Sequence, residues 1–169
     1  MSTSSVQSAP APAPPVLVDP RGPRLAAALT AVVLAAVLVT GSAWLLALQA
    51  LVFAFGAAGR SPYGVLYARL LRPRLGPPAE LEDTRPLRFA QAVGLAFTVV
   101  ALVGLALPTA ALTVVATAAA LAAAFLNAAF GICLGCEVYL LLRRATSRTP
   151  IARTVPNDRS IHPRTEVAV

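Results

Sequence analysis

Apolar residues occur in two long runs that contain no charged side chain. The first run extends from Leu25 to Gly59, and the second extends from Phe89 to Cys136. A helix rises about 1.5 Å per residue, and the apolar core of a bilayer is about 30 Å thick. Each run is therefore too long for one crossing and must fold back on itself, which predicts two helical hairpins in a membrane.

Residues inside each run indicate where the chain turns. Gly41 is a weak helix former in the middle of the first run, and Pro108 interrupts the second. A cleaved signal peptide ending near Gly41 is the alternative, but the apolar run continues beyond that point. We therefore predict an all-α fold with four transmembrane helices as two hairpins. The expected spans cover about residues 22–40, 43–58, 87–106 and 109–142.

The fourth predicted helix is longer than one crossing requires. As a continuous helix it would be about 50 Å long. It must therefore tilt, bend near Gly131 and Gly135, or leave the membrane at its C-terminal end. Gly131 and Gly135 also continue a face of small residues that begins at Ala120, and such a face is typical of helix packing in membranes.

Polar segments flank and separate the hairpins. Residues 1–20 are rich in Ala, Pro and Ser and are predicted to be disordered, and residues 145–169 are predicted to form a flexible basic tail. In the loop over 59–86, Tyr and Leu recur with helical spacing, which predicts a short amphipathic helix over about 63–72 on the membrane surface. The membrane domain is therefore expected to cover residues 21–144.

Composition limits the functions of the chain. Its 169 residues are 57% hydrophobic and only 12% charged, whereas about a quarter of the residues in a soluble domain are charged. The fourteen basic residues are all Arg and the net charge is +7. These arginines flank the apolar runs and do not form a dense basic tract, so we interpret them as topology signals and expect no nucleic-acid binding.

The distribution of arginine predicts an orientation. The N-terminal flank, the central loop and the C-terminal end contain every arginine, and the two hairpin turns contain none. Four helices place those three segments on one side of the lipid bilayer. The positive-inside rule makes that side cytoplasmic. The sequence thus predicts a multi-pass protein of the bacterial inner (plasma) membrane with both termini in the cytoplasm.

The two hairpins begin with related residues. Asp19 and Asp83 start similar Asp-x-Arg segments, and Gln49 and Asn127 are the single amides of the two second helices. A parallel internal repeat explains this pattern, and ordinary flanking chemistry before a membrane helix explains it as well. Each amide is expected to form an interhelical hydrogen bond, which Gln49 and Asn127 could share, or to line a polar path.

Both cysteines lie near the end of the fourth predicted helix, in a CxxC motif. On a continuous helix Cys133 and Cys136 share one face, at a spacing that suits an internal disulfide or two ligands of one metal. A closed metal site needs about four ligands, which would require a second chain in a homo-oligomer, so we predict no metal. The cytoplasmic side keeps thiols reduced, which argues against a structural disulfide.

The chemistry of the cysteines depends on their surroundings. A reactive thiol needs a lowered pKa, which an arginine or a helix N-terminus supplies, and the neighbouring Glu137 opposes this. Glu137 itself is expected at the membrane interface, because a buried acid is costly. Free cysteine also behaves as a small buried hydrophobe. Packing alone therefore explains Cys133 and Cys136 at least as well as reactivity does.

Two segments of the chain are distinctive: Pro86-x-Arg88-Phe89-Ala90-Gln91, and Ala124-Phe125-Leu126-Asn127-Ala128-Ala129-Phe130-Gly131 with the following Cys133-Leu134-Gly135-Cys136-Glu137-x-Tyr139. They resemble an uncharacterised family of bacterial membrane proteins, a "domain of unknown function" family common in actinobacteria. The resemblance covers about residues 17–145 and implies a small four-helix integral membrane protein, but it supplies no reaction. Family members accompany thioredoxin-like and sulfurtransferase-like proteins, which implies a thioredoxin-like protein or a sulfur carrier as partner.

Three functions follow as hypotheses. The first is a dithiol, Cys133 and Cys136, that exchanges thiol and disulfide states or handles reduced sulfur at the cytoplasmic face. The second is a small transporter or channel subunit with Gln49 and Asn127 at the contact between the hairpins. The third is a structural subunit of a larger membrane complex in which the cysteines only pack. The sequence assigns no enzymatic reaction and no cofactor.

Overall fold

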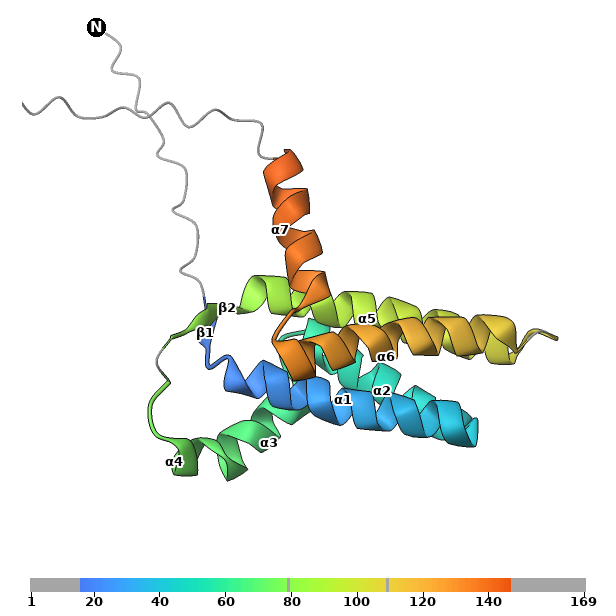
Figure 1. Ribbon diagram of the computed structural model, residues 1–169, viewed down its shortest axis with the longest axis horizontal. Coiled ribbons are helices and arrows are strands. Elements are labelled where there is room, and N and C mark those ends of the chain that lie inside the picture. The colour runs from blue at the N-terminus through green and yellow to red at the C-terminus, as the bar shows by residue number, and fades with distance from the viewer. Residues whose placement is uncertain (1–15, 79, 109, 147–169) are drawn as a thin grey trace, which may run out of the picture.

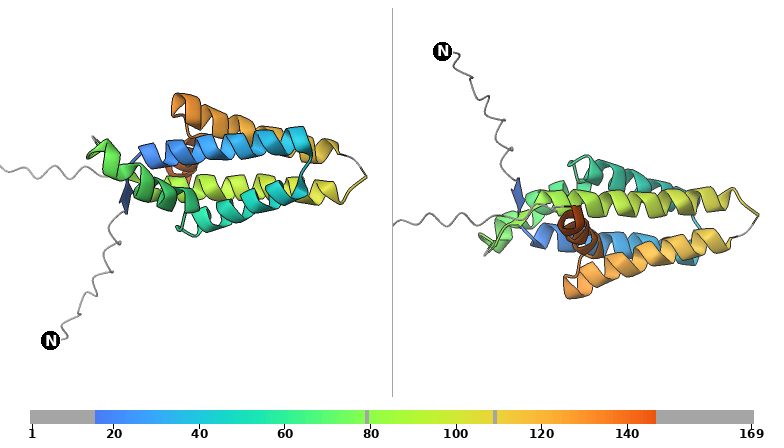
Figure 2. Two further views of the ribbon diagram at one scale, coloured as in Figure 1. Left: turned by 90° about the horizontal axis from the view of Figure 1, so that it is seen from below. Right: turned by 90° about the horizontal axis from the view of Figure 1, so that it is seen from above.

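The two apolar runs fold into two antiparallel helical hairpins, as their length requires. The computed structural model describes residues 16–78, 80–108 and 110–146. Helix α1 packs against α2 and α6, and α5 also packs against α2 and α6, so the four helices form one bundle (Figures 1 and 2). The bundle helices are α1 (Arg21–Thr40), α2 (Ala43–Ala57), α5 (Thr84–Leu105) and α6 (Ala111–Phe130).

Shorter elements gather at one end of the bundle, opposite the two hairpin turns (Figure 1). A two-stranded antiparallel ribbon joins the starts of the two hairpins, with Leu17 opposite Asp83. All the arginines of the described segments belong to this end, which we call the arginine end. Its elements are β1 (Leu17–Val18), α3 (Pro62–Leu70), α4 (Arg72–Leu75), β2 (Glu82–Asp83) and α7 (Leu134–Thr146).

The first hairpin turn forms at the residues that interrupt the apolar run. Gly41 has a φ of 65°, and its N–H donates to the carbonyl of Val37 at 2.8 Å. Glycine tolerates this left-handed conformation because it has no Cβ. The side chain of Ser42 then accepts a hydrogen bond from the N–H of Leu45 and caps α2. Glycine as a terminator followed by serine as a cap produces the turn.

The helix expected over 109–142 is two helices in the structure. Helix α6 ends at Phe130 because Gly131 adopts a φ of 73°. The N–H of Gly131 donates to the carbonyl of Asn127, and the N–H of Ile132 donates to that of Leu126, which closes the helix end. Helix α7 then leaves the bundle sideways (Figure 1), so the excess length is accommodated by a break.

The amphipathic segment expected over 63–72 also divides into two helices. Helix α3 begins after Ser61, whose side chain accepts a hydrogen bond from the N–H of Gly64 at 3.2 Å. Helix α3 ends at Leu70, and Pro73 lies in the first turn of α4, where proline is tolerated. The tails expected over 1–20 and 145–169 lie largely outside the described residues.

Buried apolar residues and glycines pack the helices closely. The core cluster lies in the half of the bundle nearer the hairpin turns and includes Leu34, Leu46 and Ala101. Nearer the arginine end, the ring of Phe53 from α2 packs against Gly94 of α5 so tightly that a Cβ on the glycine would lie 2.6 Å from the ring. Small residues thus allow the close helix contacts that are typical of membrane bundles.

The lengths of the helices define the membrane-spanning candidates. Helices α1, α5 and α6 are long and apolar enough to cross a membrane. Helix α2 has only 15 residues, or about 22 Å, and it qualifies only together with α3, from which it is bent by 79°. The described chain is therefore helical with three spanning candidates, or four if that bent pair counts as one span. Exposed apolar side chains, including Trp44 at the first hairpin turn, cover the bundle.

Candidate functional site

The break at Gly131 places Cys133 at the start of a helix. Cys133 directly precedes the first residue of α7, and its carbonyl accepts the hydrogen bond of the Glu137 N–H at 3.0 Å. It therefore occupies the N-cap position, where the free backbone N–H groups of the first turn converge. Cys136 lies within that first turn. The two thiols are free, and they do not lie on one face of a continuous helix as the sequence suggested.

In this arrangement the two thiols have different pKa values. The pKa of Cys133 is lowered to about 7, chiefly because the Cys136 thiol donates a hydrogen bond to its sulfur. Burial opposes the shift, and the backbone N–H groups of Cys136 and Gly135 add to it. The pKa of Cys136 is raised, first because it donates that hydrogen bond, and then because it is partly buried and close to Cys133, Glu82 and Glu137. The hydrogen bond from the Cys136 thiol, supported by the backbone N–H groups at the start of α7, thus favours the thiolate of Cys133.

A close crossing with α5 fixes the start of α7. A Cβ on Gly135 would lie 2.6 Å from both Cα and Cβ of Ala90, so only glycine permits this approach. One turn further along, the rings of Phe89 and Tyr139 lie with their centroids 5.6 Å apart. Gly135 therefore lies where α7 crosses α5, whereas Gly131 ends α6.

The two amides highlighted by the sequence have different surroundings. Gln49 is fully buried, and it donates to the hydroxyl of Thr30 in α1 at 3.3 Å and accepts from the hydroxyl of Tyr63 in α3 at 3.1 Å. Gln49 and Asn127 form no hydrogen bond with each other in the described chain. Asn127 lines a cavity instead, and Glu137 is exposed in the first turn of α7.

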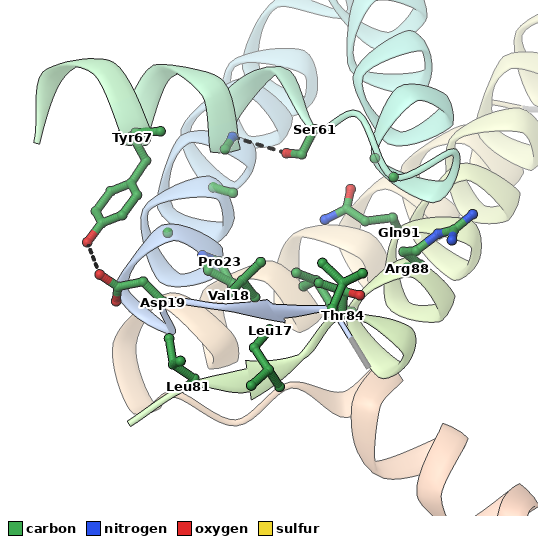
Figure 3. Close-up of a pocket in the computed structure, with 18 of the residues that line it drawn as sticks. Leu17, Val18, Asp19, Pro23, Ser61, Tyr67, Leu81, Thr84, Arg88 and Gln91 are labelled. Atoms are coloured by element: carbon green, nitrogen blue, oxygen red, sulfur yellow. Dashed lines mark hydrogen bonds between the residues drawn. The ribbon is translucent and has the colours of Figure 1, made fainter. Parts of the chain in front are cut away.

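A first cavity lies beneath β1 at the arginine end, and we call it the ribbon cavity (Figure 3). Its volume is about 370 Å³. The hydroxyl of Tyr67 donates to Asp19 at 2.7 Å across one side, and Arg88 and Gln91 line another. Removal from water tends to raise the pKa of Asp19, but hydrogen bonds from Tyr67 and Arg21 and the charges of nearby arginines hold it below its usual range. The ribbon cavity is therefore lined by charged groups.

A second cavity lies among α1, α5, α6 and the start of α7, and we call it the bundle cavity. Its volume is about 410 Å³, and its walls are mostly apolar. Four polar side chains line it, and no charged residue of the described chain does so. These four are Thr30, Gln91, Asn127 and Cys133. The cavity brings one of the predicted amides and one of the predicted thiols to the same space.

Sequence reasoning missed several residues of these cavities. Asp19 and Arg88 were visible only as parts of the two Asp-x-Arg segments, and Gln91 only within a segment that resembled a family. Tyr67 was assigned to a surface helix, but it is buried and bonded to Asp19. The repeated Asp-x-Arg pattern was the signal that could have pointed to this end of the bundle.

Metal binding receives no support from the arrangement of side chains. Within residues 16–78, 80–108 and 110–146, no group of three or more His, Cys, Asp or Glu side chains could hold a metal ion.

The fold and these surfaces define a helical membrane protein with a pair of free thiols at one end of its bundle. The chain belongs to the family described as "Domain of unknown function (DUF4395)", which matches residues 18–144. The family resemblance expected from the sequence is thereby confirmed. No curated protein and no solved structure matches the chain. The family description assigns no reaction, so the function has to be inferred from the site.

Proposed function

We propose that this protein is a membrane-bound dithiol that exchanges thiol and disulfide states with a partner protein. One observation carries the proposal: Cys133 occupies the N-cap position of α7, and Cys136 lies in the turn that follows. The N-terminal end of a helix stabilises a negative charge. A thiolate at Cys133 is therefore both a good nucleophile near neutral pH and a good leaving group.

The exchange proceeds through a mixed disulfide. When Cys133 and Cys136 are joined, a thiolate of the partner attacks the sulfur of Cys133, and Cys136 leaves and takes up a proton. A second thiolate of the partner then attacks the partner sulfur of the mixed disulfide and releases Cys133 as a thiolate. The partner gains a disulfide, and two electrons pass to the pair. Because the reduced form is stabilised at Cys133, the pair accepts electrons readily.

The location of the pair supports a cytoplasmic partner. The arginine end faces the cytoplasm by the positive-inside rule, with α2 and α3 together forming the fourth span and both termini inside the cell. Helix α7 has no buried residue, and Leu141 and Leu142 are exposed, which suits a helix on the membrane surface. The partner is then a soluble thioredoxin-like protein or a sulfur carrier that reaches the inner membrane.

Reaction with an aromatic disulfide tests this function. The reduced protein is expected to release two aromatic thiols per chain, because Cys133 attacks and Cys136 resolves the mixed disulfide. Cys136→Ser should stop after one thiol and retain the adduct on Cys133, which intact-mass measurement detects. Cys133→Ser should lower the rate at least a hundredfold while thermal unfolding stays unchanged, because serine also caps helices.

Two results would contradict the proposal. One is an unchanged rate in Cys133→Ser, which would mean that its thiol is not the nucleophile. The other is a folded wild-type protein whose cysteines react only after denaturation. In that case the pair would serve packing alone.

A further inference from the structure

The bundle cavity is lined by two side-chain amides that have no hydrogen-bond partner among the described residues. These are the amides of Gln91 and Asn127. Gln91 lies between the two cavities, with its Oε1 against Gly56 on the ribbon-cavity side, so that it is the Nε2 group that is available to an occupant of the bundle cavity. Thr30 is engaged by Gln49. Two open amides in a mostly apolar cavity can donate hydrogen bonds, and such convergent polar groups fix the orientation of a ligand.

The two cavities differ in charge, and this difference selects the ligand. Asp19, Arg72 and Arg88 line the ribbon cavity, so it suits a charged group. The bundle cavity is lined by no charged residue of the described chain, and burying an unpaired charge there would be costly. Its occupant is therefore a neutral, mostly apolar molecule with polar atoms at one end.

The position of the bundle cavity makes it accessible to such a molecule. Its walls come chiefly from α1, α5 and α6, the three helices that are long and apolar enough to span a membrane, and Phe53 of α2 and the start of α7 complete them. A row of small side chains on α6 leaves space along the helix axis, away from the cysteines. This row is Ala119, Ala120, Ala123 and Ala124. A lipid-soluble molecule with a long apolar tail fits this shape.

We propose that the bundle cavity binds a membrane quinone, which oxidises the Cys133–Cys136 pair. This inference rests on the proposed function, because a dithiol that accepts electrons from a partner needs an acceptor for them. The carbonyl oxygens of a quinone accept hydrogen bonds from Gln91 and Asn127, its isoprenoid tail lies along the alanine row, and Cys133 lines the same space. A volume of about 410 Å³ is within the usual range for small-molecule sites.

The proposed reaction balances without another reactant. Two thiols, on Cys133 and Cys136, become one disulfide and lose two electrons and two protons. The quinone takes up the two electrons and the two protons and becomes a quinol. The disulfide is then ready to accept electrons from a partner again, and the quinol returns to the bilayer.

Anaerobic oxidation of the purified, reduced protein by a fully ring-substituted benzoquinone with one isoprene unit tests the site. Full substitution prevents direct alkylation of the thiols. We expect one quinol per chain, the loss of both free thiols, and a decrease of two hydrogens in intact mass. Asn127→Leu and Gln91→Leu should each raise the quinone concentration for half-maximal rate by about fivefold, because each removes one hydrogen bond.

Neighbouring residues on α6 provide a matched pair of variants. Ala123 lines the cavity, whereas Ala122 is exposed and does not. Ala123→Phe fills the cavity and should lower the oxidation rate by quinone at least tenfold, while Ala122→Phe should leave it unchanged. Equal rates in both variants would overturn the site and would be the result if a lipid chain occupied the cavity instead.

The wild-type protein separates the two proposals. If its thiols react with the aromatic disulfide and the quinone leaves them reduced, the quinone site is overturned and the proposed dithiol function stands. If its thiols do not react with the aromatic disulfide, the proposed function fails, whatever the quinone does. Thermal unfolding of each variant confirms that the folded protein is being compared.

Discussion

The two halves of the molecule follow the same plan. Each begins with an aspartate that accepts a hydrogen bond from the N–H two residues later: Asp19 from Arg21 at 3.0 Å, and Asp83 from Arg85 at 2.9 Å. Each continues as a helical hairpin, α1 with α2 and α5 with α6, and then breaks at a glycine with positive φ before a short helix, α3 or α7. The antiparallel ribbon joins the two starting points.

An arginine of each half reaches the break in the other half. Arg88 donates to the carbonyl of Ala57 at 3.0 Å and lies beside Gly59. The guanidinium of Arg24 lies beside Gly131, 3.1 Å from the place where a Cβ would be. The two Asp-x-Arg segments thus share a reciprocal arrangement, whereas the two amides, Gln49 and Asn127, differ in their distance from the breaks.

The halves differ in the residue that caps the short helix. Ser61 lies two residues after Gly59 and caps α3, and Cys133 lies two residues after Gly131 and immediately precedes α7. Each of these side chains accepts a hydrogen bond from the backbone N–H three residues later. The donor to Ser61 is Gly64, and the donor to Cys133 is Cys136. A serine there stabilises a helix. A cysteine in the same position gains a lowered pKa, so one backbone arrangement serves structure in one half and, as we propose, chemistry in the other.

The largest expected difference between the halves concerns the glycines of the short helices. Gly135→Ala should lower the free energy of unfolding by about 1–3 kcal/mol, because its Cβ would collide with the backbone of Ala90. Gly64→Ala should be neutral or stabilising by up to about 1 kcal/mol, because its Cβ would meet only Ser61 at 3.4 Å. Denaturant titration in detergent measures both, and equal effects would contradict the close crossing of α7 on α5.

The next effect concerns the pKa of Cys133. Alkylation of its thiol should become faster as pH rises through about 7 and level off above it, because only the thiolate reacts. Cys136→Ala removes the hydrogen bond that chiefly lowers this pKa, so the midpoint should rise toward the ordinary thiol value of about 8.5. The pH dependence of iodoacetamide labelling measures the midpoint, and an unchanged midpoint would show that Cys136 does not influence it.

The smallest effect comes from moving a thiol into the other half. In a chain carrying Cys133→Ser and Cys136→Ser, Ser61→Cys should give a thiol whose pKa is lower than that of an ordinary cysteine but higher than that of wild-type Cys133. Gly64 supplies a backbone N–H to this position but no second thiol. The pH dependence of iodoacetamide labelling measures this pKa. A midpoint at the ordinary thiol value would mean that the cap position alone does not lower the pKa.

Charge-free runs made the bundle predictable, and long-range contacts made the rest unpredictable. The lengths of the two runs, with Gly41 and Pro108 at the turns, placed four helical segments within a few residues of α1, α2, α5 and the start of α6. The break at Gly131 has no proline or polar cluster beside it, so the sequence could suggest a bend there but could not establish one. Around the break, Arg24 contacts Gly131 and Ala90 contacts Gly135. Both contacts come from residues that are distant in sequence, so the sequence pattern around Gly131 does not reveal them.

The position of the two thiols in the candidate site depends on the helix break at Gly131. On a continuous helix, Cys133 and Cys136 belong to one face and packing is the simpler explanation. Once Gly131 ends α6, the same spacing puts one thiol before a helix and the other inside its first turn. Asn127 was identified from its position in an apolar run, whereas the open amide of Gln91 depends on how α5 lies in the bundle.

The single tryptophan provides a built-in optical reporter. Trp44 is 79% exposed at the first hairpin turn, at the opposite end of the bundle from the cysteines (Figure 1). Its fluorescence therefore reports how deeply the turn is immersed in the bilayer, since aromatic rings favour the membrane–water boundary. Quenchers attached at known depths along lipid chains would locate this end of the molecule without any label on the cysteines.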